Sequence, residues 1–97
     1  MSATLSTHVL DLGRGTPAAG VRVELRRDGD LVAGSETDED GRVSDLGGAL
    51  ETGTYRLVFN PTSSFFRSVE LELDLEDRHH HVPLLVSPFG CTSYLGS

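Results

Sequence analysis

The sequence predicts an all-β protein, an antiparallel β-sandwich of about seven to eight strands, because short alternating segments are separated by frequent turns. Turn-forming residues recur in "GRGTPAAG", "RDGD", "DEDG", "LGG" and "ETG", and Gly, Pro and Asp are the residues that tight turns favour. Between the turns, apolar and polar residues alternate with the period of a half-buried strand. No segment has the spacing of an amphipathic helix.

Three segments show this alternation over their whole length. In "VRVELRR", residues 21–27, one face is apolar and the other is charged. The segments "GTYRLVF", residues 53–59, and "VELELDL", residues 69–75, repeat the pattern. Each predicts a strand with one side in the core and the other in water. The residues expected to face the core are Val21, Val23, Leu25, Tyr55, Leu57, Phe59, Val69, Leu71, Leu73 and Leu75.

The segment "VPLLVSP" near the end of the chain differs because both of its faces are apolar. One face carries Val82, Leu84 and Val86, and the other carries Pro83, Leu85 and Ser87, so both are largely apolar. A strand that is apolar on both faces is covered on both faces. Since one face of a sandwich strand meets the core, we expect the other to meet a partner chain or a closed cavity.

Three consecutive histidines precede this segment, and the alternation separates them. His79 and His81 share the face of Leu85, whereas His80 falls on the core side, where we expect a structural role. His79 and His81 could supply two nitrogen ligands to zinc, but no third ligand has a recognisable spacing and the chain has no thiolate cluster. We therefore predict no metal site.

Composition limits the partners and the location of the protein. The chain has 97 residues, which fits a single domain over residues 1–97. Its formal net charge is −7, with acidic residues spread along the chain, which argues against nucleic acid or an anionic membrane as a partner. Cys91 is the only cysteine, so we expect a small buried thiol in a cytoplasmic protein without an intrachain disulfide. The N-terminus lacks the basic start and apolar core of a signal peptide.

Motifs along the whole chain resemble those of one enzyme family. "STHVLDLGRGTPAAGVRVEL", "TDEDGR", "HHHVPLLVSPFG" and the final "YLGS" occur in this order and resemble the 5-hydroxyisourate hydrolases, the transthyretin-related enzymes of purine catabolism. The resemblance implies a transthyretin-like (prealbumin-like) sandwich that forms a homotetramer, a dimer of dimers, with active sites in a channel at the dimer–dimer interface. It also implies hydrolysis of 5-hydroxyisourate to 2-oxo-4-hydroxy-4-carboxy-5-ureidoimidazoline in urate degradation, without metal or cofactor.

The resemblance also assigns the functional residues. His8, Arg42 and His81 match the catalytic positions of the family, and Tyr94 and Ser97 match its terminal substrate-binding motif. Opening a cyclic amide with water needs a base, a donor for the developing oxyanion and an acid for the leaving nitrogen. An imidazole pKa of about 6.5 suits a histidine to the first and third roles, and a guanidinium suits the second. His81 is our preferred base, and His8 is the alternative.

The chain departs from the family pattern toward its end. Leu95 stands in place of an arginine in the terminal motif, and Cys91 stands in place of a tyrosine. Between "LVFN" and "SFF" only "PTSS" remains, so we expect the short helix of the family to be reduced or absent. Loss of the terminal arginine could weaken activity or change the preferred ligand.

Two other functions fit parts of the sequence. With Leu95 in place of arginine the expected channel becomes more apolar, as it would be in a transthyretin-like carrier of small ligands. The segment 15–59 also has the outline of structural β-sandwich modules, such as adhesin repeats and the regulatory domains beside carboxypeptidases. Retention of His8, Arg42 and His81 favours the enzyme, because neither a carrier nor a scaffold needs all three residues.

Overall fold

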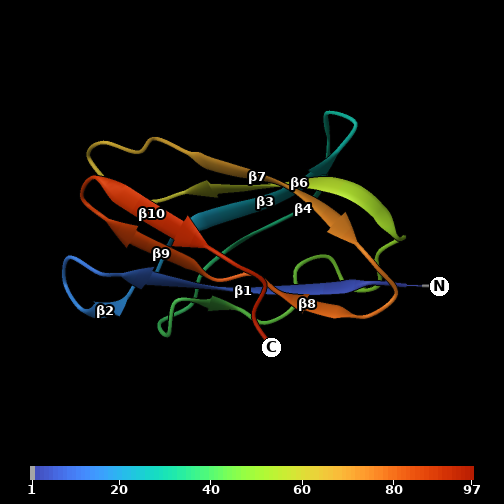
Figure 1. The fold of residues 1–97 in the computed structure, drawn as a ribbon, viewed down its shortest axis with the longest axis horizontal. Coiled ribbons are helices and arrows are strands. Elements are labelled where there is room, and N and C mark those ends of the chain that lie inside the picture. The colour runs from blue at the N-terminus through green and yellow to red at the C-terminus, as the bar shows by residue number, and fades with distance from the viewer. Residues whose placement is uncertain (1) are drawn as a thin grey trace.

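Ten strand segments form two sheets that pack face to face in the computed structural model, which describes residues 2–97 (Figure 1). One sheet has six strands in the order β10-β9-β1-β2, with β5 and β8 also paired to β1, and the other has the order β4-β3-β6-β7. The predicted all-β sandwich is confirmed, and none of the strands of residues 2–97 is joined by a helix. The same residues contain no helix that is long and apolar enough to cross a membrane. The strands are β1 (Thr4–Asp11), β2 (Thr16–Pro17), β3 (Arg22–Arg27), β4 (Asp30–Glu36), β5 (Arg42–Val43), β6 (Gly53–Asn60), β7 (Val69–Leu75), β8 (His79–His81), β9 (Leu84–Ser87) and β10 (Gly90–Ser93).

Strand β1 is the centre of the six-stranded sheet. It pairs antiparallel with β2 and β5 but parallel with β8 and β9. The parallel pairing was not expected from the sequence, and it arises because the chain crosses from β7 in the other sheet before it enters this one at β8. The apolar segment after the histidines is also interrupted between β8 and β9, where Val82 and Pro83 lie outside both strands. Pro83 has no N–H to donate to a ladder.

The core lies between the two sheets, and it contains the residues that the alternation selects. The predicted inward residues of β3 and β6 are almost completely buried. In β7 only Leu75 is buried, and the other predicted inward residues are half-buried, because β7 is an edge strand of its sheet. On the six-stranded sheet, the buried side chains that form the other side of the core include Leu5, Val9 and Leu84. Burial of each large apolar side chain contributes about 1.5–3 kcal/mol to folding.

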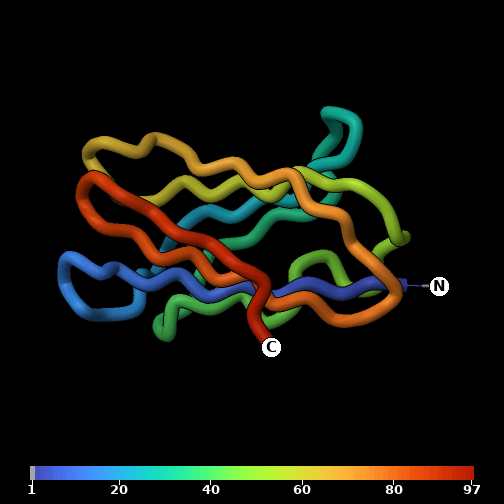
Figure 2. The backbone as a smooth tube through the Cα atoms, viewed as in Figure 1, coloured from blue at the N-terminus to red at the C-terminus, as the bar shows by residue number. Residues whose placement is uncertain are grey.

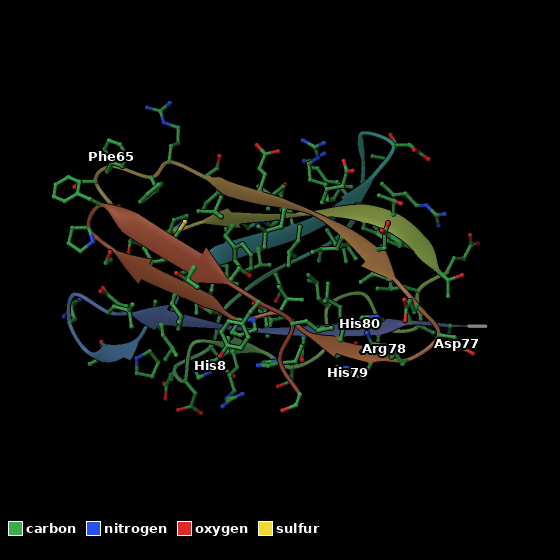
Figure 3. The ribbon with its side chains drawn as sticks, viewed as in Figure 1. His8, Phe65, Asp77, Arg78, His79 and His80 are labelled. Atoms are coloured by element: carbon green, nitrogen blue, oxygen red, sulfur yellow. The ribbon has the colours of Figure 1, made fainter. Side chains whose placement is uncertain are left out.

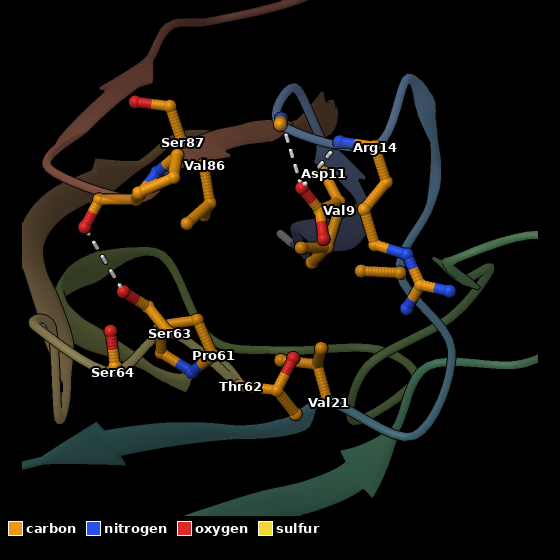
Figure 4. Close-up of a pocket in the computed structure, with 13 residues that line it drawn as sticks. Val9, Asp11, Arg14, Val21, Pro61, Thr62, Ser63, Ser64, Val86 and Ser87 are labelled. Atoms are coloured by element: carbon orange, nitrogen blue, oxygen red, sulfur yellow. Dashed lines mark hydrogen bonds between the residues drawn. The ribbon is translucent and has the colours of Figure 1, made fainter.

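The connection between β6 and β7 is a short loop without a helix, as expected. Figure 2 shows this connection (gold) beside the β9–β10 turn (red) at one end of the molecule. Phe65 contacts Phe89 edge-on across the two loops, with ring centroids 5.8 Å apart, and Ser63 Oγ donates to the carbonyl of Pro88 over 3.5 Å. The loop leaves a cavity of about 370 Å³ between the sheets (Figure 4). Asp11 lines this cavity, but its Oδ1 already accepts backbone N–H groups of Gly13 and Arg14.

The expectation of a buried Cys91 is wrong for the single chain, where the thiol is exposed. Cys91 lies opposite Val86 in the β9–β10 register, so both side chains lie on the core side of the sheet. Val86 is buried, but Cys91 lies on β10, the last strand of its sheet. The side of an edge strand is open to solvent, so a residue with core-facing parity remains accessible there.

Candidate active site

The predicted catalytic residues lie on the outward face of the six-stranded sheet. Leu5, Thr7 and Val9 of β1 are buried in the core, so the alternating positions Ser6 and His8 point outward. The register places His81 opposite Ser6 and Arg42 opposite His8. Neighbouring strands are about 4.8 Å apart, so β8, β1 and β5 bring residues far apart in the sequence onto one small surface. In Figure 3, His8 and His79 lie on the side of β1 away from the four-stranded sheet.

His81 is half-buried, and its environment favours the neutral imidazole. Burial lowers the pKa of His81 below the ordinary 6.5, and the nearby charges of Arg42, His8 and His79 lower it further. Its Nδ1 lies 2.8 Å from Ser6 Oγ. A neutral histidine with one ring nitrogen held by a partner has the other free for proton transfer. His81 therefore has the protonation state that a general base needs near neutral pH.

His8 and Arg42 are positioned by the turn "TDEDG". His8 Nε2 donates to the carbonyl of Asp40 over 2.9 Å, which leaves Nδ1 of a neutral ring as an acceptor. The carboxylate of Asp38 accepts the N–H groups of Asp40 and Arg42, each over 2.9 Å. This Asx turn holds the backbone of Arg42 against β1, where it faces His8.

Gly41 is required for this turn to approach β1. Its φ of +75° lies in the left-handed region, and a Cβ atom here would lie 2.5 Å from the carbonyl oxygen of Val9. The Val9 N–H donates to the carbonyl of Gly41 over 2.7 Å. Only glycine adopts this conformation without steric cost while allowing such a close contact. The turn chemistry of the sequence thus sets the position of Arg42.

The Arg42 side chain is exposed and available to a ligand. Within residues 2–97, no carboxylate forms an ion pair with it. A guanidinium without a carboxylate partner offers forked N–H donors to carbonyl or anionic oxygens. Arg42 can therefore stabilise negative charge that develops on a substrate bound over this face.

The C-terminal residues separate into two groups. The Gly96 N–H donates to the carbonyl of His81 over 2.7 Å, and a Cβ at this glycine would lie 2.9 Å from Cδ2 of the His81 ring. This contact brings the neighbouring Ser97 to the edge of the site. Tyr94 is not brought to His81. It is 54% exposed and lines, with Leu95, a separate cavity of about 410 Å³ against β7.

His80 has the structural environment that its parity predicts. It is 3% exposed, its Nδ1 donates to the carbonyl of Thr4 over 3.2 Å, and its Nε2 accepts the Glu76 N–H over 3.1 Å. Two backbone partners satisfy both ring nitrogens, so His80 joins β8 to β1 and to the end of β7. No group of three or more His, Cys, Asp or Glu side chains within residues 2–97 is arranged to hold a metal ion.

One residue of the site, Ser6, was not selected from the sequence. Ser6 contacts both outward histidines, with its Oγ 2.9 Å from His79 Nε2 and 2.8 Å from His81 Nδ1. The alternation of "TLSTH" places Ser6 on the face of His8, and this was the only local signal. The contacts themselves depend on the parallel register between β1 and β8, which no local pattern reveals.

Comparisons with known proteins agree with this architecture. A 5-hydroxyisourate hydrolase of Rhizobium meliloti is 39% identical over 117 aligned positions, which cover 99% of this chain and 98% of that protein. The solved structure of Klebsiella pneumoniae 5-hydroxyisourate hydrolase has a TM-score of 0.88 and 34% identity, covering 98% of this chain and 99% of that one. Sea bream transthyretin, solved in complex with thyroxine, has a TM-score of 0.78 and 26% identity over 95% of this chain and 93% of that one.

These likenesses confirm the transthyretin-like form of the sandwich and the resemblance inferred from the motifs. The 117 aligned positions exceed the 97 residues of this chain, so the alignment contains gaps in this chain. The model of the HIUase/Transthyretin family matches residues 5–96. With that match over nearly its whole length, the chain belongs to the HIUase/Transthyretin family.

Proposed function

We propose that this protein hydrolyses the ring amide of 5-hydroxyisourate to give 2-oxo-4-hydroxy-4-carboxy-5-ureidoimidazoline. The observation that carries the proposal is the arrangement of the outward face, where a neutral His81 lies across β1 from the unpaired Arg42. The 39% identity to a 5-hydroxyisourate hydrolase over nearly the whole chain supports the same substrate. Similarity to a bifunctional uric acid degradation protein of Arabidopsis thaliana supports a role for this reaction in urate degradation. We propose that the reaction needs no metal or cofactor.

The chemistry follows from the roles that these side chains can fill. His81 Nε2 takes a proton from water, and the resulting hydroxide adds to the carbonyl carbon of the ring amide. The guanidinium of Arg42 stabilises the oxyanion. Arg42 does not have to break an ion pair with a carboxylate first, so this stabilisation needs no reorganisation of the site. The C–N bond breaks as the leaving nitrogen receives a proton from a protonated histidine, His81 or His8. A substrate contact of Ser97, at the edge of this site, belongs to the proposal. A substrate contact of Tyr94 stays a prediction from the family resemblance, because within its own chain Tyr94 lines the separate cavity against β7.

We further propose that the active protein is a homotetramer, a dimer of dimers, with each site closed at the dimer–dimer interface. On a single chain the site lies on an open sheet face. Leu10 and Leu85 are adjacent on that face, and both are only half-buried in the single chain. Covering them with a second sheet would bury apolar area and exclude water from the site, which strengthens electrostatic stabilisation. A cytoplasmic location, inferred from the single cysteine, is also part of the proposal.

The test is to generate 5-hydroxyisourate with urate oxidase and to follow its ultraviolet decay with and without the protein. We expect the protein to accelerate the decay, and we expect His81→Asn to lose about a hundred- to ten-thousand-fold of that acceleration, the range of general acid–base catalysis. Decay at the uncatalysed rate in the presence of the intact protein would refute the hydrolase. Sedimentation velocity on the same sample tests the tetramer, which a monomer at assay concentration would contradict.

A second candidate function is binding of an apolar small molecule. Tyr94 and Leu95 line a cavity with Leu71 and Leu73, and sea bream transthyretin was solved with thyroxine. A carrier would bind an aromatic probe, such as anilinonaphthalene sulfonate, with a saturable affinity that Leu95→Arg weakens. It would leave 5-hydroxyisourate decay unchanged. The hydrolase is favoured because a carrier does not require the neutral His81 beside an unpaired arginine.

A further inference from the structure

Four polar side chains on β1 and β8 form one continuous hydrogen-bonded chain that ends at His81. Thr4 Oγ1 lies 2.7 Å from His79 Nδ1. Ser6 Oγ lies 2.9 Å from His79 Nε2 and 2.8 Å from His81 Nδ1. The parallel register creates this chain, because Thr4 lies opposite His79 and Ser6 opposite His81 on the same face. It runs from an exposed end at Thr4 and His79 to the half-buried His81.

The number of available hydrogens limits how these four side chains can be hydrogen-bonded to one another. A hydroxyl has one hydrogen to donate, and a neutral imidazole has one N–H. Ser6 is 8% exposed, and its Oγ has no partner within the described residues other than the two histidines. Its hydrogen therefore goes to one of the two rings, which leaves two consistent arrangements.

In the first arrangement, His81 Nδ1–H donates to Ser6, Ser6 donates to His79 Nε2, and His79 Nδ1–H donates to Thr4. The Nε2 of His81 is then a free base. In the second arrangement every hydrogen bond is reversed, and the hydrogen of His81 is on Nε2, where it can serve as an acid. In both arrangements His79 and His81 carry their hydrogen on the same ring nitrogen.

We propose that Thr4, His79, Ser6 and His81 form a proton relay, in which Ser6 and His79 are positioning residues that set the tautomer of His81 and accept its excess proton. This inference rests on the proposed hydrolase function. As water transfers a proton to His81 Nε2, the Nδ1 proton of His81 passes to Ser6 Oγ, and the Ser6 proton passes to His79 Nε2. Only N–H and O–H bonds break and form, and the positive charge ends on His79.

The relay leaves His81 ready for the second half of the reaction. His81 now carries its hydrogen on Nε2, so it can give that proton to the leaving nitrogen while its Nδ1 regains one through Ser6. The exposed His79 can meanwhile exchange its proton with water. Positive charge is disfavoured on His81, because that ring is half-buried and faces Arg42 of β5 and His8 of β1, whereas the side chain of His79 is exposed to water.

Comparison with His80 distinguishes a relay from a structural network. His80 is bound by a backbone carbonyl and a backbone N–H, which fix one tautomer because neither partner can exchange roles. The partners of His79 and His81 are hydroxyls, which both donate and accept. Of the three consecutive histidines, the outward two can thus reverse their hydrogen bonds, whereas His80 cannot.

The first test is the ring tautomers in the unliganded protein, measured by ¹H–¹⁵N spectra of the imidazoles near pH 8, well above the ordinary imidazole pKa of about 6.5. We expect His79 and His81 to show the same tautomer or the same mixture, with His80 as an internal reference in the Nδ1–H form. In Ser6→Ala the agreement between His79 and His81 should be lost. Unlike tautomers on these two rings in the parent protein would overturn the relay.

The second test is kinetic and uses matched pairs of variants. Loss of a group that orients a catalytic histidine typically costs about 10- to 100-fold, so we expect Ser6→Ala and His79→Gln to lose about this much in kcat with little change in KM. Ser6→Thr, which retains a hydroxyl, should recover most of the loss. An unchanged kcat and an unchanged pH profile in His79→Gln would overturn the relay.

The two tests separate the relay from the proposed function. Matching tautomers in a protein that does not hydrolyse 5-hydroxyisourate would support the hydrogen-bonded relay and refute the hydrolase. Unlike tautomers in a protein that does hydrolyse it would refute the relay and leave the hydrolase supported. Circular dichroism of each variant checks that the loss of activity does not come from unfolding.

Discussion

The outward faces of the two sheets differ in whether their arginines have carboxylate partners. On the four-stranded sheet, Arg22 and Arg26 both pair with Glu24, and Arg56 pairs with Glu70 and Glu72. On the six-stranded sheet, Arg42 has histidines and hydroxyls around it and no carboxylate partner within the described chain. On the first face these arginines are paired with carboxylates of the same sheet, and on the second face a cation is left for a ligand.

This difference separates a solvated surface from a reactive one. Paired charges on an exposed sheet contribute little to stability and keep the surface soluble. An unpaired guanidinium beside an imidazole whose pKa is lowered, first by burial and then by that guanidinium, has no structural benefit, because the nearby cation works against protonation of the ring. Such an arrangement is expected where the missing negative charge comes from a substrate.

The largest effect is expected from removing the unpaired cation. We predict that Arg42→Gln lowers kcat/KM for 5-hydroxyisourate by about a hundred- to thousand-fold, the cost of losing one oxyanion donor. The matched control is Arg56→Gln, which removes another exposed arginine from the other sheet and should leave kcat/KM unchanged. Equal rates for the two variants, in the ultraviolet decay assay, would show that the two faces do not differ in function.

The next effect concerns the turn that positions Arg42. Gly41→Ala places a Cβ against the Val9 carbonyl at a φ of +75°, and we expect the free energy of unfolding in urea to fall by about 1–3 kcal/mol. Gly15→Ala is the control, because its φ of +71° is similar but no atom lies within 4 Å of the added Cβ. Gly41→Ala should therefore lose more stability than Gly15→Ala, and it alone should lower activity. Equal losses in the two variants would contradict the close approach.

The pH dependence gives a smaller effect with a definite sign. Because burial, and then Arg42, lower the pKa of His81 below 6.5, the neutral base persists into mildly acidic solution, and the acid limb of kcat/KM should have its midpoint below 6.5. The unfolded chain binds this proton first, so the same group lowers the free energy of unfolding as the pH falls from 6.5 to the folded-state pKa. An NMR titration of His81 measures the shift directly.

The same NMR titration, applied to variants of Arg42 and Arg56, compares the two faces through the pKa of His81. In Arg42→Gln the His81 pKa should rise toward its ordinary value, because one of the charges that lowers it is gone. In Arg56→Gln the pKa should not move, since Arg56 lies on the other sheet. A His81 pKa at or above 6.5 in the parent protein would remove the argument for a neutral base.

Much of the fold could be predicted from the sequence, because burial in a strand leaves a local period. The alternation of β3 and β6 selected Leu25, Leu57 and Phe59, which are fully buried. The same pattern was less accurate for β7, because it reports the face of a strand and not whether that strand lies at a sheet edge. The expectation of a buried Cys91 came from the residue type alone, and it was wrong because Cys91 lies on an edge strand. Whether a strand lies at the edge of a sheet depends on the order of the strands in that sheet, and no local sequence pattern reports that order.

The site was predictable only in part, for a related reason. His8, Arg42 and His81 came from motif resemblance, and the structure places them on one face through the register of β1 with β5 and β8. The contacts of Ser6 with His79 and His81 join residues 73 and 75 positions apart. A parallel pairing between the first and eighth strands creates these contacts, and alternation along either strand alone contains no information about it.

The smallest predicted effect concerns the paired face. Arg56→Gln should change the free energy of unfolding in urea by less than about 1 kcal/mol, because Arg56 is 53% exposed and its partners Glu70 and Glu72 are 47% and 69% exposed, so that water already screens the pairs. Raising the salt concentration should reduce even this difference. A loss above about 2 kcal/mol would mean that the paired face stabilises the sandwich, and the contrast with Arg42 would then be one between a structural and a functional surface. A loss within the expected range makes these ion pairs nearly neutral for folding, so that the contrast between Arg56 and Arg42 lies in ligand binding.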